Sequence, residues 1–437
     1  MSVETANGPA QDNTSSQRRG VVPSIVIWVL VGLFGLSVAS LVYALRSETM
    51  RPDFRLLTVS FLYLMGVSQA GVVFCAITRL VRAQWAKPYY RLAELSTLAF
   101  FPFALGTFLL IYVYARDELF HWLTNHSTEG HASPWLSSHW LLIRNLFGLC
   151  LFYGLSALYV VRSLKPDLPG DRSIFLNLAR GAARNSQENR SVPYAESDAC
   201  KVERQLYLLS PWVIAGFVIC NTLFAWDFGM MLIPHWHSSV FPIYFWFGNL
   251  FAGTAALIVF PAVLGRSHAA GQHFGPEQIR GLGMLLTTFT LMWLYFFWAQ
   301  FFVIWFGNLP REFEPLWRQM YGHYAPYYWS MMTGCFFLPF AAFIFAIVKR
   351  SLPAMCLIGF GINAGIWINK YLMVLPALAP DDRPFDHWLD VILALGLLAG
   401  FVAAVVFLAG RFPLYSQWEM RLRPETDQLA KMRQWLP

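Results

Sequence analysis

The chain has 437 residues, of which 57% are hydrophobic and only 13% are Asp, Glu, Lys or Arg, whereas soluble domains average about 25% charged residues. This composition excludes a soluble globule. The net charge of +7 does not indicate nucleic-acid binding, because the basic residues lie between apolar runs, where membrane topology explains them.

The predicted elements begin after a polar stretch of 20 residues. The apolar run 21–45 is too long for the core of a signal peptide and lacks a small-residue cleavage pattern, so we expect a retained first helix. Ten runs can each cross a hydrocarbon core about 30 Å thick. They cover residues 21–45, 56–81, 92–115, 137–161, 206–230, 239–265, 281–307, 325–348, 353–376 and 388–410. The sequence therefore predicts an all-α polytopic membrane protein with about ten transmembrane helices.

The distribution of basic residues predicts the orientation. Of the 32 Lys and Arg residues, 23 lie on the side of the N-terminus and seven lie on the opposite side. This asymmetry places both termini in the cytoplasm. The expected organisation is a cytoplasmic N-terminus (1–20), helices 1–4 (21–161), a cytoplasmic loop (162–205), helices 5–10 (206–410) and a cytoplasmic tail (411–437). The basic part of the long loop, 172–184, fits a surface helix against anionic lipid or a solvated linker equally well.

The six cysteines show no CxxC or other cluster-ligand spacing. Five of them lie inside apolar runs, where a small buried hydrophobe is the usual role. We therefore expect no haem and no iron–sulfur cluster bound by this chain.

A break between two apolar runs, at 227–247, concentrates polar groups next to lipid. It contains Asp227, His235 and His237, and intramembrane ionisable groups are costly enough to need a reason. Counting residues along the spans places Arg144, Gln300 and Lys370 at the same outer level of the membrane. Because Arg144 and Asp227 have opposite charges at this level, we expect them to form an ion pair.

These residues have alternative readings. Arg144 and Lys370 could snorkel to the interface, and Asp227 could cap loop amides or serve only to neutralise Arg144. The two histidines could make interfacial hydrogen bonds or exchange protons with a quinol; two ligands without a third predict no metal site.

Further polar residues lie deeper or nearer the cytoplasm. Glu94 is close to the cytoplasmic start of the third helix, and Gln69, Asn221 and Asn249 are near mid-depth. Buried amides usually join helices to one another. Together with Glu94, Gln300 and Lys370, they are also candidates for a proton path.

Four motifs resemble the NrfD/polysulfide-reductase family of quinol-interacting membrane subunits. They are PHWHSSVFPIYFWFGNLFAG (234–253), WAQFFVIWFGNLPREFEPLWR (298–318), YGHYAPYYWSMM (321–332) and INAGIWINKYLMVLPAL (362–378). The chain is most similar to the two large membrane subunits of alternative complex III, a bacterial quinol:electron-acceptor oxidoreductase. It departs from the last motif at Lys370, where an arginine is frequent.

The resemblance implies two successive four-helix bundles, helices 2–5 and 6–9, flanked by helices 1 and 10. It implies a subunit of a respiratory or photosynthetic electron-transfer complex in the bacterial inner membrane. The substrate would be menaquinol or ubiquinol, bound near the periplasmic face, with Asp227, His235 and His237 in the matching motif and proton conduction through the bundles.

The partners implied are a second NrfD-like subunit, a periplasmic iron–sulfur/molybdopterin-like subunit, multihaem cytochrome c subunits and lipids. A secondary transporter and a structural anchor without its own quinol site remain alternatives.

Overall fold

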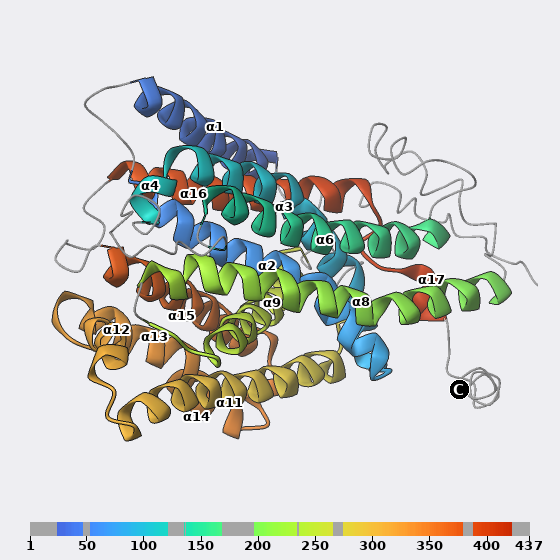
Figure 1. The fold of residues 1–437 in the computed structure, drawn as a ribbon. Helices are drawn as coiled ribbons and strands as arrows, with labels where there is room; N and C mark the ends of the chain where they lie inside the picture. The colour runs from blue at the N-terminus through green and yellow to red at the C-terminus, as the bar shows by residue number, and fades with distance from the viewer. Residues whose placement is uncertain are drawn as a thin grey trace, which may run out of the picture.

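The computed structural model describes residues 24–46, 53–120, 135, 137–167, 196–233, 236–264, 274–378 and 388–421. Within these ranges every regular element is helical, and no strand occurs. Ten helical segments are long and apolar enough to cross a membrane (Figure 1). The prediction of a polytopic all-α membrane protein with ten spans is confirmed.

The spans follow the apolar runs closely. They are α1 (Ser24–Arg46), α2 (Arg55–Leu80), α3 (Lys87–Tyr114), α6 (Ser138–Leu164), α8 (Glu196–Phe228), α9 (Phe241–Leu264), α11 (Pro276–Phe306), α13 with α14 (Ala325–Met332 and Leu338–Ile344), α15 (Leu352–Leu378) and α16 (Trp388–Arg411). Three shorter helices are α4 (Arg116–Leu119), α12 (Pro310–Met320) and α17 (Gln417–Arg421). Helix α8 begins at Glu196, so residues 196–205 are helical, whereas the sequence analysis placed them in the loop 162–205.

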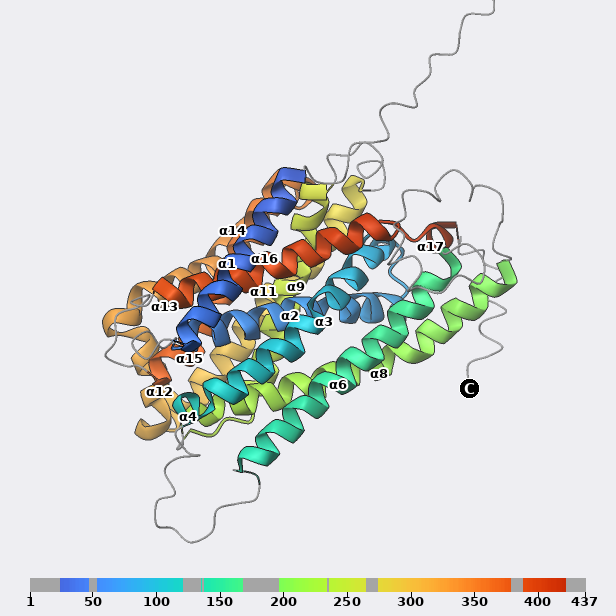
Figure 2. The same cartoon turned by 90° about the horizontal axis from the view of Figure 1, so that it is seen from above.

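The spans form two four-helix bundles in chain order. In the first, α2, α3, α6 and α8 contact one another in a ring; in the second, α9, α11, α13–α14 and α15 do the same. The bundles meet where α2 packs against α9 and α15, and where α8 packs against α9. The remaining spans, α1 and α16, pack together beside α2 and α3 (Figures 1 and 2).

Helix α2 is the centre of the molecule. Of its 26 residues, 22 are buried, whereas α1 buries only Ser37 and Ala44. Small residues let α2 and α9 approach closely. A Cβ atom at Gly66 would collide with Asn249, and one at Gly253 would collide with Ala70. Close approach at small residues is how membrane helices gain packing energy, since lipid supplies no hydrophobic drive between them.

The eighth span is interrupted between α13 and α14. Residues Thr333–Phe337 form a π-helical segment, and Pro339 follows one residue into α14. Proline has no N–H to donate to the carbonyl four residues earlier, so the regular hydrogen-bond ladder cannot pass this point. Such π segments frequently occur at functional sites.

The two ends of the molecule differ in what caps them. One end, here called the α12 end, carries α4, α12 and the connection from α8 to α9 (Figure 2). The other, the α17 end, carries α17 and the turn between α2 and α3.

Candidate functional site

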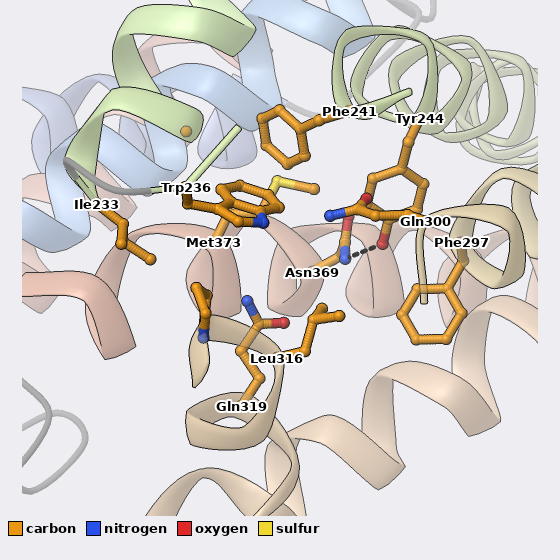
Figure 3. A pocket seen from close by; sticks show the side chains of 12 residues that line it. Ile233, Trp236, Phe241, Tyr244, Phe297, Gln300, Leu316, Gln319, Asn369 and Met373 are labelled. Carbon is orange, nitrogen blue, oxygen red and sulfur yellow. Dashed lines mark hydrogen bonds between the residues drawn. The ribbon is translucent and has the colours of Figure 1, made fainter. Parts of the chain in front are cut away.

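A pocket lies at the α12 end of the second bundle. It is bounded by the connection between α8 and α9 and by parts of α9, α11, α12 and α15 (Figure 3). Its empty volume, including the open mouth, is about 480 Å³. Between the side chains it is narrow, with room for little more than a water molecule. A ring-sized ligand therefore requires one of these walls to move.

Aromatic rings form much of the wall. The Trp236 and Phe241 rings meet edge to face with centroids 5.0 Å apart, and the Tyr244 and Phe297 rings are 6.0 Å apart. Trp236 is held in place although it lies outside any helix, because its backbone N–H donates to the carbonyl of Ile233. Flat apolar surfaces of this kind suit an aromatic ligand.

Polar groups converge on the same space. The amides of Gln300, Gln319 and Asn369 line it, and Asn369 Nδ2 donates to Tyr244 Oη at 2.6 Å (Figure 3). The indole Nε1 of Trp236 is buried without a hydrogen-bond partner in the structure. Buried donors almost always have a partner, so this N–H indicates a ligand or water position.

Helix α12 covers the pocket as a lid. Pro315, Leu316 and Gln319 face inward from it, and its Glu312 Oε2 accepts a hydrogen bond from the His237 backbone N–H at 3.1 Å. The lid is flanked by two left-handed residues, Asn308 with φ 49° and Gly322 with φ 70°. Such residues at element ends are common hinge positions.

A separate charged cluster closes the same end of the first bundle. Arg144 binds Asp227 through two bonds, Nε to Oδ2 at 2.7 Å and Nη2 to Oδ1 at 2.6 Å. Asn145 Nδ2 adds a third bond to Oδ2 at 2.5 Å, and Arg144 also donates to the Trp135 carbonyl. All three side chains are buried. The pairing expected from depth along the spans is present, and it leaves neither charge free.

A chain of amides crosses the middle of the molecule. Asn249 donates to Asn221 at 2.6 Å, and Asn221 donates to Gln69 at 2.6 Å. These three residues come from α9, α8 and α2, so the chain links the two bundles. Asn249 Oδ1 is left without a partner in the structure.

The α17 end holds a buried charge network that the sequence did not reveal. Arg91 pairs with Glu94 at 2.9 Å and with Asp167 at 2.5 Å. Arg79 pairs with Glu203 and, at 2.5 Å, with Glu419. Arg91 and Glu94 are three residues apart on α3, a spacing that is visible in the sequence. The other partners, Asp167, Glu203 and Glu419, lie 76, 124 and 340 residues from their arginines, so no spacing could have shown those pairs.

The remaining candidates have distinct places. Lys370 is fully buried on α15; its Nζ is 3.4 Å from the Phe245 carbonyl and 3.1 Å from the centre of the Phe245 ring. Gln300 lines the pocket, whereas the His237 side chain is exposed. His235 lies outside the described residues. Among the described residues, no group of three potential metal ligands occurs.

The structure thus separates the predicted residues: Glu94 belongs to the network at the α17 end, Lys370 lies apart at Phe245, and the others divide as follows. Gln300 belongs to the pocket, Arg144 and Asp227 belong to the ion-pair cluster, and Asn221 and Asn249 belong to the amide chain. Sequence reasoning missed Asn369 and Gln319 as pocket residues; the position of Asn369 beside Lys370 was the available signal. Comparison with models of known protein families and with curated proteins found no match.

Proposed function

We propose that this chain is the membrane subunit of a quinol:electron-acceptor oxidoreductase complex and that it binds quinol in the pocket beneath α12. The observation that carries the proposal is the pocket itself, in which aromatic walls surround several uncharged hydrogen-bonding groups. A quinol ring is flat, apolar on its faces and polar at two opposite oxygens. Three of the four motifs that resemble quinol-interacting subunits contribute lining residues, and the fourth, 321–332, supplies Met331, whose Sδ accepts a hydrogen bond from Asn369.

Quinol oxidation requires distinct roles of the residues that line the pocket. Oxidation of a quinol releases two protons and two electrons. The unpartnered Trp236 N–H donates to one ring oxygen, and the Gln300 and Gln319 amides serve the other. The electrons pass to an iron–sulfur cluster of a partner subunit with a molybdopterin-like fold, and from there to multihaem cytochrome c subunits. A second NrfD-like subunit completes the membrane part.

Protons leave toward the α12 end, which we take as the periplasmic face of a bacterial inner membrane. His237 is exposed there, beside Glu312, and is suited to pass protons outward. Asp227 is engaged by Arg144 and Asn145, so in this proposal it maintains the structure of the first bundle. Glu94 and the amides of Gln69, Asn221 and Asn249 remain the candidates for proton movement through the protein.

The test measures quinol oxidation by the purified complex. Trp236→Phe keeps an aromatic side chain and removes the indole N–H, and loss of one hydrogen bond corresponds to a fall in kcat/KM of about tenfold. The combination Gln300→Leu with Asn369→Leu should abolish saturable oxidation.

The matched control is Trp246→Phe, which alters a tryptophan on α9 that does not line the pocket. If the Trp236 and glutamine–asparagine variants oxidise quinol as the control does, the pocket is not the quinol site. His235→Ala tests the remaining histidine prediction in the same assay.

A further inference from the structure

The two bundles repeat one another in sequence and in contacts. The chain 66–71 reads GVSQAG on α2, and 248–253 reads GNLFAG on α9. Residues 221–234, which begin in α8, and residues 363–376, which lie in α15, share a second sequence pattern with identical intervals. It comprises Asn221, Asp227, Met231 and Pro234 in the first half, and Asn363, Asn369, Met373 and Pro376 in the second.

The helix contacts follow the same correspondence. If α2 corresponds to α9 and α8 to α15, then the contact of α2 with α15 has its counterpart in the contact of α9 with α8, and both are present. The α2–α9 crossing lies between the two copies. This is the pattern expected of two parallel copies related by a two-fold axis at that crossing.

The correspondence extends to the third helix of each bundle. On α6, Asn145 lies three residues before Gly148; on α13, Met331 lies three residues before Gly334 of the π segment that follows. Asn145 Nδ2 donates to Asp227, and Met331 Sδ accepts from Asn369 Nδ2 at 3.1 Å. Asp227 and Asn369 are corresponding positions, so the same inter-helix contact occurs in both bundles.

The two copies differ in charge at this contact. The first copy has Arg144 and Asp227, and the second has Ser330 and Asn369 at the corresponding positions. In the first copy the guanidinium binds the carboxylate and lies over the Trp135 ring, with Cζ 4.5 Å from the ring centre. In the second copy there is no such pair, and Asn369 lines the pocket.

We infer that the first bundle contains a second copy of the ligand pocket, which Arg144 closes by binding Asp227. The inference rests on the proposed function for the class of ligand, a flat neutral ring with hydrogen-bonding oxygens. The guanidinium is itself flat and lies against an aromatic ring, as such a ligand would. Removing the ion pair as a unit opens this site without leaving an unpaired charge.

The experiment counts binding sites in the full-length chain, reconstituted in lipid nanodiscs. A hydroxyquinoline N-oxide, an analogue of the quinol ring, is titrated and followed by quenching of its fluorescence. The wild type binds one analogue per chain. The pair Arg144→Met and Asp227→Leu binds two, and adding Asn369→Leu to this pair returns the number to one.

A double variant that is monodisperse and still binds one analogue overturns the inference. A wild type without any saturable site overturns the proposed function instead, so the two failures are distinguishable.

A second experiment, in which the ion pair is introduced into the second bundle, keeps the inference testable if the Arg144→Met and Asp227→Leu variant misfolds. Ser330→Arg with Asn369→Asp builds the ion pair into the second bundle and should weaken analogue binding at least about tenfold. Ser330→Arg alone is the matched control, because an unpaired arginine there extends toward lipid and leaves the pocket open. Equal binding by the paired variant and the control, at equal thermal midpoints, contradicts the inference.

Discussion

Lys370 places a primary amine in a fully buried site whose nearest groups are the ring and carbonyl of Phe245. Among the described residues, no acidic side chain is paired with it. By contrast, each guanidinium of Arg79, Arg91 and Arg144 is buried against at least one carboxylate. A buried amine that lacks an ionic partner costs free energy of folding, because water is not replaced by an equivalent partner.

Lys370→Met should therefore stabilise the chain. Methionine has a similar length without the amine, and relief of an underpaired buried polar group is worth about 1–3 kcal/mol. The measurement is the unfolding free energy in mixed micelles. Lys370→Arg, which places an obligate charge in the same buried site and adds bulk, serves as the control and should lower it. A lower unfolding free energy for Lys370→Met would show that the amine has a favourable role.

For single residues, the sequence was informative where two charged side chains that are costly to bury lie at the same depth in the membrane. Arg144 and Asp227 are at one level, and neither is tolerable alone in hydrocarbon, so their contact could be expected. The pocket residues could not be found in this way, because amides and aromatics are ordinary helix-packing residues in a membrane protein. Asn369 differs from Asn221 only in what surrounds it, and that depends on helix rotation.

Helix α12 shows how an element outside the apolar pattern controls the pocket. The sequence 310–320 is too short and too charged to be a span, so the search for spans assigned it to a loop. Its outer side carries Trp317, whose ring stacks on that of Tyr321, the residue that follows α12; the ring centres are 3.8 Å apart and both side chains are half exposed. Aromatics in this position anchor an element at the membrane interface.

Glu312→Ala should increase the rate at which a bound quinol analogue dissociates. The carboxylate accepts the His237 backbone N–H and so joins the lid to the connection, and its loss favours the open lid. We expect a rise in the dissociation rate constant of about three- to tenfold in stopped-flow displacement. Glu312→Gln retains an acceptor oxygen and should dissociate at close to the wild-type rate. Equal rates for the alanine and wild-type forms would show that Glu312 does not hold the lid.

The crossing of α2 and α9 is the second element with a measurable consequence. Gly253→Leu places a side chain where a Cβ atom already lies 3.0 Å from the Val67 carbonyl. Overpacking of this kind costs about 1–3 kcal/mol or more, so the thermal midpoint should fall. Gly106→Leu on α3 is the control, since nothing lies within 4 Å of its Cβ position. Equal midpoints for the two variants would contradict close packing at this crossing.

For the whole molecule, the ten-span layout could be predicted because span length and hydropathy are local properties. The arrangement of the spans could not, since nearly all runs are apolar on every side. The resemblance supplied the two bundles, and the contacts among α2, α3, α6 and α8 agree with it. The network at the α17 end illustrates the limit: Glu419 reaches Arg79 from 340 residues away.

The orientation of the molecule is testable directly. Charge asymmetry predicts that both termini, and so the α17 end, lie in the cytoplasm. A green fluorescent protein fused after residue 437 should fluoresce, and alkaline phosphatase inserted in the connection 121–134 should be active. With the two reporters exchanged, the fluorescent protein should not fluoresce and the phosphatase should be inactive. Fluorescence and phosphatase activity at the opposite positions would reverse the orientation.

The position of α2 also sets an order of assembly during synthesis. This helix enters the membrane second, but α15 and α16, which cover two of its sides, are synthesised last. Until α15 is synthesised, Ser60 on α2 lacks the Trp367 indole N–H that donates to it in the folded chain. Similarly, α1 packs chiefly on α16. The first and last spans therefore join only when translation is nearly complete. A ribosome that stalls before residue 388 leaves a chain whose first span, α1, has no partner. In such a chain the central span, α2, is open to lipid and to quality-control proteases on the side that α16 would cover.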